Sequence, residues 1–238
     1  MLTVILLDCA LELVPSEISS FKDVQKQAGR KGKKPNEILL DQTHHGRAMT
    51  KLEQSDRRGR PDIVFLSLVT LLETPLCKEG LLQVYMHLQD GRVVEIRPDV
   101  RLPRNYDRFV GLIEQLLTTG RVPVEGDPLL QVSKQSLSNL VSKMKIESTN
   151  VRTILAIEGG EKTGMQGLRN ILPDDASVPV IVGIGAFPHG DISDEIKQLF
   201  DIHLELDKDV MMAWHVCAEV LWVYSERIEV IRRRYSSI

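Results

Sequence analysis

Residues 178–184 form an apolar run that leads directly into a glycine-rich segment at residues 185–190. A run of this length and hydrophobicity is typical of a strand that is buried on both faces, as strands of parallel sheets are. Residues 2–8 predict another buried strand at the start of the chain. Predicted strands and helices then alternate along most of the 238 residues, and this order indicates an α/β fold, with one domain over residues 1–238.

Hydrophobic periodicity and turn signals predict the other elements. Residues 81–87 and 93–96 are predicted to form a β-hairpin, an insertion at about 81–97, because Asp90-Gly91 between them is a strong turn signal. Residues 121–128 are predicted to form a loop, and Gly120 to close the helix before it. Further strands are predicted at residues 38–41, 153–157 and 203–206, and helices at 15–28, 63–73, 133–145, 165–172, 193–200 and 209–235.

The predicted C-terminal helix carries apolar residues at spacings that alternate between four and three. This spacing produces a narrow apolar seam of the coiled-coil type. Such a seam either packs on the protein's own sheet or forms a subunit interface, and the pattern favours neither. The seam residues are Val210, Trp214, Cys217, Leu221, Tyr224, Ile228 and Ile231.

The composition excludes several classes of protein. The formal net charge is −3, so the chain is not a generally basic nucleic-acid coat protein, and nucleic-acid contacts require a local cluster of Lys and Arg. Cys9, Cys77 and Cys217 lie far apart without a C-x-x-C pattern, which argues against a zinc site or a disulfide framework. No apolar run reaches membrane-spanning length and no signal peptide is recognisable, so we expect a cytoplasmic protein with neither a metal nor a membrane partner.

Residues 97–111 contain three arginines around a predicted helix start. Arg101, Arg104 and Arg108 surround Pro103, which is well placed to open a helix. Exposed N–H groups give a helix start partial positive charge, so cations there are costly unless an anion lies over them. A helix N-terminus with forked guanidinium groups is a phosphate-binding arrangement. The segment therefore predicts contact with a nucleic-acid backbone.

The tripeptide Arg60-Pro61-Asp62 is a further candidate site. Pro61 suits the first position of a helix, and the residue before a proline is pushed toward extended geometry, so Arg60 projects from the helix end. Asp62 either stabilises the helix start or contacts a nucleobase, with Arg60 on a phosphate or base. The basic run at residues 57–60 favours the functional interpretation.

Two glycine-containing loops follow predicted strands. Residues 183–190 lie where a ligand crevice forms in α/β sheets, and residues 159–164 follow the strand predicted at 153–157. The first lacks the last glycine of a dinucleotide fingerprint and has Asp191 where a P-loop needs lysine, and the second fails these patterns too. Each loop is therefore either a ligand site or a tight turn.

Several histidines and basic runs have ordinary explanations. His44 and His45 are adjacent and point to different faces of any regular element, which disfavours a shared metal, so we expect a polar loop near the surface. His189 either donates to a ligand or belongs to a plain turn. The basic runs at residues 30–34 and 232–234 are expected to be solvated.

Four motifs in order carry a family resemblance: R-P-D-I at 60–63, G-L-L-Q-V-Y at 80–85, R-L-P-R-N-Y-D-R-F-V-G-L at 101–112 and G-A-F-P-H-G at 185–190. Together they resemble the ribosome-biogenesis family of SPOUT-class pseudouridine N1-methyltransferases that act on small-subunit ribosomal RNA. The resemblance runs from about Leu39 to the C-terminal helix. The short N-terminus is similar to that of the archaeal members.

The resemblance implies a homodimeric α/β knot, with a parallel sheet between helix layers and a deep trefoil knot at the C-terminus, an exception to the unknotted rule. It implies that S-adenosylmethionine binds against three loops. In the third loop, Asp207-Lys208-Asp209 departs from the small and apolar residues that the resemblance leads us to expect. The implied cofactor-binding residues are Ala156, Ile157, Gly183, Gly185, Gly190, Leu206, Asp207 and Met211.

The resemblance also implies roles for the polar candidates. The target nucleotide has to leave its stack, as base-modifying enzymes require. Asp62 would hydrogen-bond the base, remove its proton or hold Arg60 in place, and these roles stay open. The implied catalytic residues are Asp62 and Arg60, and the implied RNA-binding residues are Arg60, Arg101, Arg104, Asn105 and Arg108.

The expected activity is methyl transfer from S-adenosylmethionine to N1 of a pseudouridine in small-subunit ribosomal RNA, with a role in ribosome assembly. The expected partners are that RNA, a second copy of the chain and ribosomal assembly proteins. One alternative is a non-catalytic RNA-binding assembly factor with the same fold. Another alternative is an enzyme that acts on a soluble nucleotide. An RNA affinity that falls steeply with salt would count against this second alternative.

Overall fold

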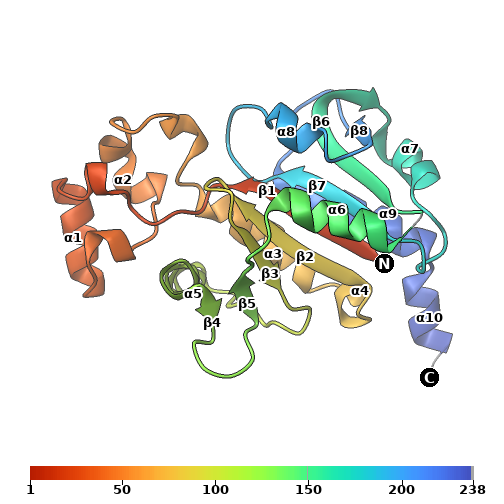
Figure 1. The fold of residues 1–238 in the computed structure, drawn as a ribbon, viewed down its shortest axis with the longest axis horizontal. Coiled ribbons are helices and arrows are strands. Elements are labelled where there is room, and N and C mark those ends of the chain that lie inside the picture. Colours follow the sequence, from red (N-terminus) through yellow and green to blue (C-terminus); the bar gives the residue numbers. More distant parts are fainter. Residues whose placement is uncertain (149, 237–238) are drawn as a thin grey trace.

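The computed structural model describes residues 1–148 and 150–236, which contain an eight-stranded mixed sheet (Figure 1). The strand order is β4-β5-β3-β2-β1-β7-β6-β8. Strands β2, β1, β7, β6 and β8 run parallel, and β3, β5 and β4 add an antiparallel edge. The strands are β1 (Leu2–Cys9), β2 (Leu82–Leu88), β3 (Val93–Ile96), β4 (Arg121–Val122), β5 (Leu130–Val132), β6 (Arg152–Lys162), β7 (Val180–Gly185) and β8 (Ile202–Glu205).

Strand β1 is buried on both faces, as its apolar sequence predicts. Alternate side chains of a strand point to opposite faces. One set (Leu2, Val4 and Leu6) belongs to the main core, which includes side chains of α3 (Pro61–Leu72), α5 (Tyr106–Thr119), α7 (Gly164–Ile171) and α9 (Ala213–Arg227). The other set (Ile5 and Leu7) packs with α6 (Leu137–Glu147) and with residues flanking α8 (Asp194–Lys197). The sheet therefore lies between two helix layers, with α6 and α8 in front of it in Figure 1.

A small helical lobe lies beside the sheet, at the left of Figure 1. It contains α1 (Lys22–Lys31) and α2 (Gln42–Met49) with the 3-10 turns Ser16–Ile18 and Pro35–Glu37, and it has a core of its own. This core holds Val14, Ile18, Val24, Ala28, Ile38, Leu40, Ala48, Met49 and Leu52.

Glu114 of α5 ties this lobe to the rest of the molecule. Its side chain is only 2% exposed, and its carboxylate accepts hydrogen bonds from Lys31 at 2.6 Å, Lys33 at 2.7 Å and the Leu39 N–H at 3.0 Å. Burial by itself raises the pKa of Glu114, but the two lysines outweigh it and hold the pKa below its usual value. The run at residues 30–34 is exposed, as expected, and two of its lysines also pair with the buried carboxylate of Glu114.

Some predicted boundaries are wrong for local reasons. The helix predicted at residues 15–28 is a 3-10 turn followed by α1, which begins at Lys22. Residues 38–41 form no strand, because the segment makes only an isolated bridge between Leu39 and Leu13. The loop predicted at 121–128 begins with β4, whose two residues are too few to produce a periodic pattern. The hairpin is confirmed, with β2 antiparallel to β3 and Gly91 at a φ of 86°.

The predicted C-terminal helix is two helices, α9 and α10 (Val230–Ser236). Glu229 has a φ of 53°, a left-handed conformation that ends α9. Four seam residues (Cys217, Leu221, Tyr224 and Ile228) are buried in the main core, where α9 packs on α3 and β7. Val210 lies before α9 and is exposed. These four residues therefore pack within the chain, whereas the seam residue Ile231 is 45% exposed. The remaining short helix is α4 (Pro75–Lys78).

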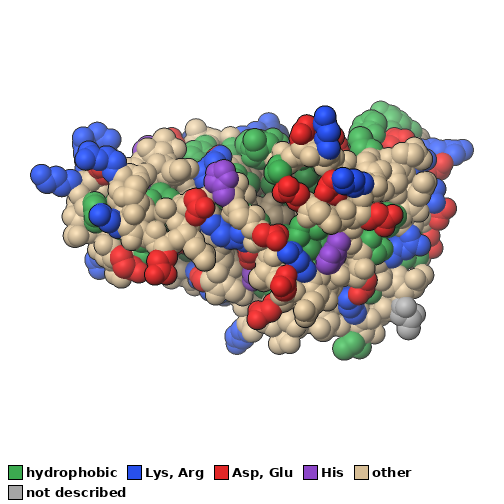
Figure 2. Space-filling model, turned by 90° about the horizontal axis from the view of Figure 1, so that it is seen from above, with side chains coloured by type: hydrophobic (Ala, Val, Ile, Leu, Met, Phe, Trp, Pro, Cys, Tyr) green, Lys and Arg blue, Asp and Glu red, His purple; other side chains and the backbone are tan. Residues whose placement is uncertain are grey.

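The surface carries charges of both signs. On the face in Figure 2, acidic and basic side chains are interspersed. Among the described residues, no helix combines the length and the apolar character needed to cross a bilayer.

Candidate active site

The start of α3 presents Arg60 and Asp62 as a fixed pair. Pro61 occupies the first helical position, as predicted. Arg60 Nε donates to Asp62 Oδ1 at 2.8 Å and Nη2 donates to Oδ2 at 2.7 Å. This bidentate hydrogen bonding raises the pKa of Arg60, and the side chains are 32% and 41% exposed. Asp62 therefore orients the guanidinium of Arg60. That Asp62 also hydrogen-bonds the target base or removes its proton stays a prediction.

The start of α5 lies against the same region. The helix begins at Tyr106 and not at Pro103, because Asn105 is the N-cap: its Oδ1 accepts from the Arg108 N–H at 3.1 Å. The Tyr106 hydroxyl donates to Asp41 Oδ2 at 3.0 Å, and its ring meets Phe65 edge-on with centroids 5.5 Å apart. Burial, together with the Asp41 carboxylate, raises the pKa of Tyr106. Tyr106 thus joins α5 to α2 and α3.

A pocket of about 400 Å³ opens where these three helices meet. This volume is within the range of small-ligand sites. Its lining combines an aromatic ring, a guanidinium, a carboxylate, an amide and a hydroxyl, the kinds of group that stack on and hydrogen-bond an unstacked nucleobase. The lining residues are Gln42, Thr43, Arg60, Asp62 and Tyr106.

Arg101, Arg104 and Arg108 are exposed around the start of α5. The Arg104 side chain is 81% exposed, and its Nη2 lies 3.3 Å from Glu73 Oε2. Exposed pairs of this kind contribute only about 0–1 kcal/mol. Within residues 1–148 and 150–236, Arg101 and Arg108 have no ion pair. All three guanidinium groups are therefore available to an external anion.

Arg57 and Arg58 differ from these arginines, although they belong to the basic run that favoured a functional interpretation. Arg58 Nε and Nη2 donate to the two Glu12 oxygens at 2.7 and 2.5 Å. Arg57 Nη2 donates to Asp8 Oδ2 at 2.6 Å. The Arg57 side chain is 17% exposed and the Arg58 side chain is 22% exposed. These two arginines are internal, so the run does not strengthen the RNA prediction beyond Arg60.

Strands β6, β7 and β8 meet at one edge of the parallel sheet. Ala156 of β6 pairs with Ile184 of β7 and Leu204 of β8, so the ends of β7 and β8 lie beside the middle of β6. Pairing of β6 with β8 is interrupted after Ala156 and resumes at Glu161, which makes β6 longer than the strand predicted at 153–157. A Cβ on Gly160 would lie 2.8 Å from the backbone of His203 and Leu204.

Several predicted cofactor residues are at this edge: Ala156 and Ile157 lie in β6, Gly185 ends β7 and Leu206 follows β8. Ala156, Ile157 and Leu206 are partly buried against the cores, as is Met211 further along the chain. Asp207 is exposed, and its Oδ1 accepts from the Asp209 N–H at 2.9 Å.

Gly183 and Gly190 also have packing explanations. A Cβ on Gly183, within β7, would come 2.6 Å from the Phe200 ring, and a Cβ on Gly190 would come 2.7 Å from Arg57 Nη1. Contact of either glycine with a cofactor stays a prediction.

Glu205 is a candidate that sequence reasoning missed. Its Oε2 accepts from the Gly159 N–H at 2.7 Å, its Oε1 lies 3.9 Å from Lys162 Nζ, and its side chain is 13% exposed. It holds the segment after Ala156 against β8. The only signal in the sequence is an acidic residue at the end of the strand predicted at 203–206.

His45 is buried in α2, so the predicted polar surface loop is wrong for this residue. Its Nδ1 accepts from the Asp41 N–H at 3.1 Å, and burial lowers the pKa of His45 to about 4. In the described part of the chain, no group of three His, Cys, Asp or Glu side chains could hold a metal ion.

Residues 4–225 match the family model described as EMG1/NEP1 methyltransferase. The chain belongs to this family. Among its curated relatives are two proteins named ribosomal RNA small subunit methyltransferase Nep1. The one from Staphylothermus marinus is 42% identical, over 92% of this chain and 93% of the relative. The one from Thermococcus onnurineus is 41% identical, over 93% and 96%.

A solved structure has the same fold as this EMG1/NEP1 chain. It is the crystal structure of Archaeoglobus fulgidus Nep1 bound to S-adenosylhomocysteine, with a TM-score of 0.81 and 33% identity. The match covers 95% of this chain and 98% of that one. The predicted family and its α/β fold are thus confirmed.

Proposed function

We propose that this protein transfers a methyl group from S-adenosylmethionine to N1 of a pseudouridine in small-subunit ribosomal RNA. The observation that carries the proposal is the methyltransferase family match over residues 4–225. The names of the relatives support ribosomal RNA as the substrate, and the ligand of the solved Nep1 supports the cofactor. The position N1 of pseudouridine depends on the resemblance carried by the motifs at 60–63 and 101–112.

The residues at the ends of β6, β7 and β8 fit S-adenosylmethionine. Ala156, Ile157, Leu206 and Met211 offer partly buried apolar surface of the kind that lines cofactor sites. The Glu205 carboxylate at the same edge has the opposite charge to a sulfonium. When bound, the cofactor supplies a methyl group that is already activated by the positive sulfur.

The chain's own residues then hold and orient the RNA. Arg101, Arg104 and Arg108 neutralise phosphates around the start of α5. The pocket beside them takes an extruded base, with Tyr106 as the stacking surface and Arg60 as a donor fixed by Asp62. Because the methyl group is activated, alignment of the nitrogen is the main contribution that these residues make.

We propose a homodimer for the same protein. Leu66 of α3 and Trp222 of α9 are 39% and 64% exposed, and Met212 just before α9 is 59% exposed. Helices α3 and α9 pack together, and exposed apolar side chains on neighbouring helices support an interaction surface there. Light scattering should give the mass of a dimer for the native chain and of a monomer for Trp222→Glu. A monomeric native chain would contradict the proposal.

The trefoil knot and the place in the cell are further parts of this proposal. The support for the knot is the family match over residues 4–225 together with the likeness to the solved Nep1 structure. We propose the cytoplasm as the compartment and ribosomal assembly proteins as further partners, because the relatives are named for a ribosomal RNA.

The test of the proposed function is a methylation assay on two RNA hairpins that differ only in uridine or pseudouridine at one position. Mass spectrometry should find one added methyl group on the pseudouridine hairpin and none on the uridine hairpin. Methylation of neither hairpin, with both RNA and S-adenosylhomocysteine bound, would instead favour a non-catalytic assembly factor. Equal methylation of both would exclude pseudouridine specificity.

A further inference from the structure

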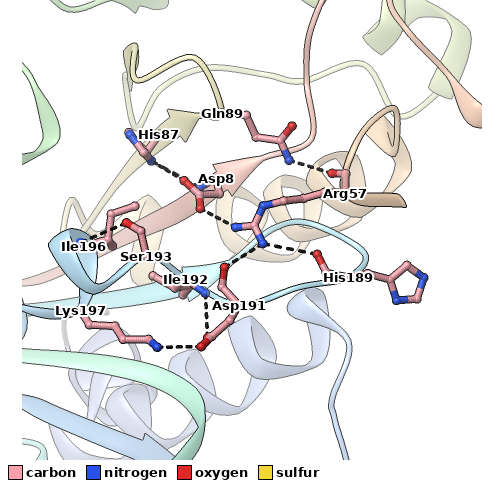
Figure 3. Close-up of polar contacts among 10 residues, drawn as sticks. All are labelled: Asp8, Arg57, His87, Gln89, His189, Asp191, Ile192, Ser193, Ile196 and Lys197. Atoms are coloured by element: carbon pink, nitrogen blue, oxygen red, sulfur yellow. Dashed lines mark hydrogen bonds and ion pairs between the residues drawn. The ribbon is translucent and has the colours of Figure 1, made fainter. Parts of the chain in front are cut away.

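The Arg57 side chain joins the 3-10 turn Ser55–Arg57 to the loop that follows β7 (Figure 3). Its Nη1 donates to the carbonyl oxygens of Asp191 at 2.8 Å and His189 at 3.4 Å. Its guanidinium carbon lies 3.7 Å from the centre of the Phe187 ring, a cation–π contact. One guanidinium thus contacts three residues of the loop.

The loop is shaped around this guanidinium. Gly190 has a φ of 94°, which residues with a side chain rarely adopt, and a Cβ there would lie 2.7 Å from Arg57 Nη1. A cavity of about 770 Å³, lined in part by His189, Gly190 and Asp191, lies beside the contact. This segment of the loop therefore has space to shift if the guanidinium is removed.

Asp8 anchors Arg57 to the end of β1. Its Oδ2 accepts from Arg57 at 2.6 Å, and its Oδ1 lies 3.1 Å from His87 Nδ1. Burial by itself raises the pKa of Asp8, but hydrogen bonds from His87 and Arg57 outweigh it and hold the pKa below the usual value. Asp8 also has a φ of 49°, and such strain persists only where the surroundings over-determine it.

The backbone around Arg57 is fixed as well. Its carbonyl oxygen accepts from Gln89 Nε2 at 2.7 Å. Three residues further along the chain is Arg60, which lines the pocket beside α5. The turn that carries Arg57 therefore leads directly into the proposed RNA pocket, while the Arg57 side chain holds the loop after β7.

We propose that Arg57 is a positioning residue for the methyl-donor loop at residues 185–191. Arg57 would affect the affinity for the cofactor through the loop that it holds, without touching the cofactor itself. The inference rests on the proposed function, because that function makes this loop part of the cofactor site.

Arg58 provides the matched control. It is the next residue, it has a similar exposure, and its guanidinium is paired bidentately with Glu12. Arg58 has no contact with the loop among the described residues, so loss of its side chain removes an ion pair of similar burial without touching residues 185–191.

The experiment is isothermal titration of the full chain with S-adenosylhomocysteine, with hydrogen exchange of residues 186–192 as a second readout. Arg57→Ala should weaken binding by about ten-fold and speed exchange in the loop. Arg57→Lys, which keeps the charge but loses the fork, should give an intermediate loss. Arg58→Ala should bind within two-fold of the native chain and leave exchange in the loop unchanged.

The outcomes separate the inference from the proposed function. A native chain that does not bind S-adenosylhomocysteine would overturn the proposed function and the inference with it. A native chain that binds, with equal affinity in Arg57→Ala and Arg58→Ala, would overturn only the inference. If Arg57→Ala does not fold, Arg57→Lys and Phe187→Leu decide the question by the same two readouts.

Discussion

Two sets of arginines in this molecule have opposite environments. The inner arginines, Arg57 and Arg58, are paired with Asp8 and Glu12 and are mostly buried. The outer arginines, Arg101, Arg104 and Arg108, are exposed around the start of α5. Both sets come from basic stretches of sequence that a nucleic-acid interpretation would treat alike.

The difference comes from carboxylates that are distant in sequence. Asp8 lies 49 residues from Arg57, and Glu12 lies 46 residues from Arg58. The end of β1 and the residues just after it bring these acids to residues 57 and 58, whereas the carboxylate that pairs with Arg104 belongs to the exposed Glu73. A basic run therefore indicates an anion site only after the acids that the fold brings to it are known.

Like Asp8 and Glu12, Glu114 is a carboxylate that pairs with basic residues distant in sequence. Its replacement should have the largest effect on stability. Glu114→Gln removes the carboxylate that accepts from Lys31 and Lys33 and should lower the free energy of unfolding by about 3 kcal/mol, roughly 1.5 for each charge-assisted hydrogen bond. Urea denaturation measures it, with Glu73→Gln as control at less than about 1 kcal/mol. Equal losses in the two variants would break the distinction between internal and external pairs.

Buried His45 should make stability depend on pH. Its pKa is about 4 in the folded protein against 6.5 in the unfolded chain, so the unfolded chain binds more protons between these values. The free energy of unfolding should therefore fall by about 2–3 kcal/mol as pH drops from 6.5 to 4. Denaturation curves of His45→Gln should lack this fall, while those of the exposed control His44→Gln should keep it. A fall that persists in His45→Gln would show that other groups cause it.

Tyr106 connects the outer arginines to the fold, and its hydroxyl should have a moderate effect. Tyr106→Phe removes the hydrogen bond to Asp41 and keeps the ring, so it should cost about 1 kcal/mol of stability. Thermal denaturation measures this cost, and RNA affinity should change little. Tyr106→Ala should weaken RNA binding as well, because stacking is lost. RNA affinity that is unchanged in Tyr106→Ala would remove the ring from the proposed base pocket.

Loss of a single outer arginine should have the smallest effect on stability. Arg104→Ala removes one exposed pair at 3.3 Å and should change the free energy of unfolding by less than about 1 kcal/mol in urea. Arg58→Ala should cost more, because it leaves Glu12 without its bidentate partner. A larger loss for Arg104→Ala than for Arg58→Ala would reverse the comparison.

Local patterns predicted the regular part of the fold. The apolar runs at 2–8 and 178–184 became the buried neighbours β1 and β7, and Asp90-Gly91 marked the hairpin correctly. Short or strained elements escaped prediction, since β4 has two residues and the break before α10 depends on one left-handed residue, Glu229. These features are decided by tertiary contacts and not by periodicity.

The candidate site was predicted only in part for a related reason. Arg60, Pro61 and Asp62 carry a local helix-start signal, and the structure confirms that signal. Tyr106 and Glu205 have no such signal, because their roles arise from Asp41 and Gly159, which come from distant segments. Asn105, predicted to bind RNA, uses its side-chain oxygen to cap α5.

The most direct test of the account is the salt dependence of RNA binding. Each phosphate contact contributes about 0.7 to the slope of log affinity against log salt for single strands. Changing Arg101, Arg104 and Arg108 together to Ala should flatten the slope by about 2, while Arg58→Ala should leave it unchanged. An unchanged slope in the triple variant, or an equal flattening in Arg58→Ala, would contradict the assignment of the outer arginines to the RNA and of the inner arginines to the fold.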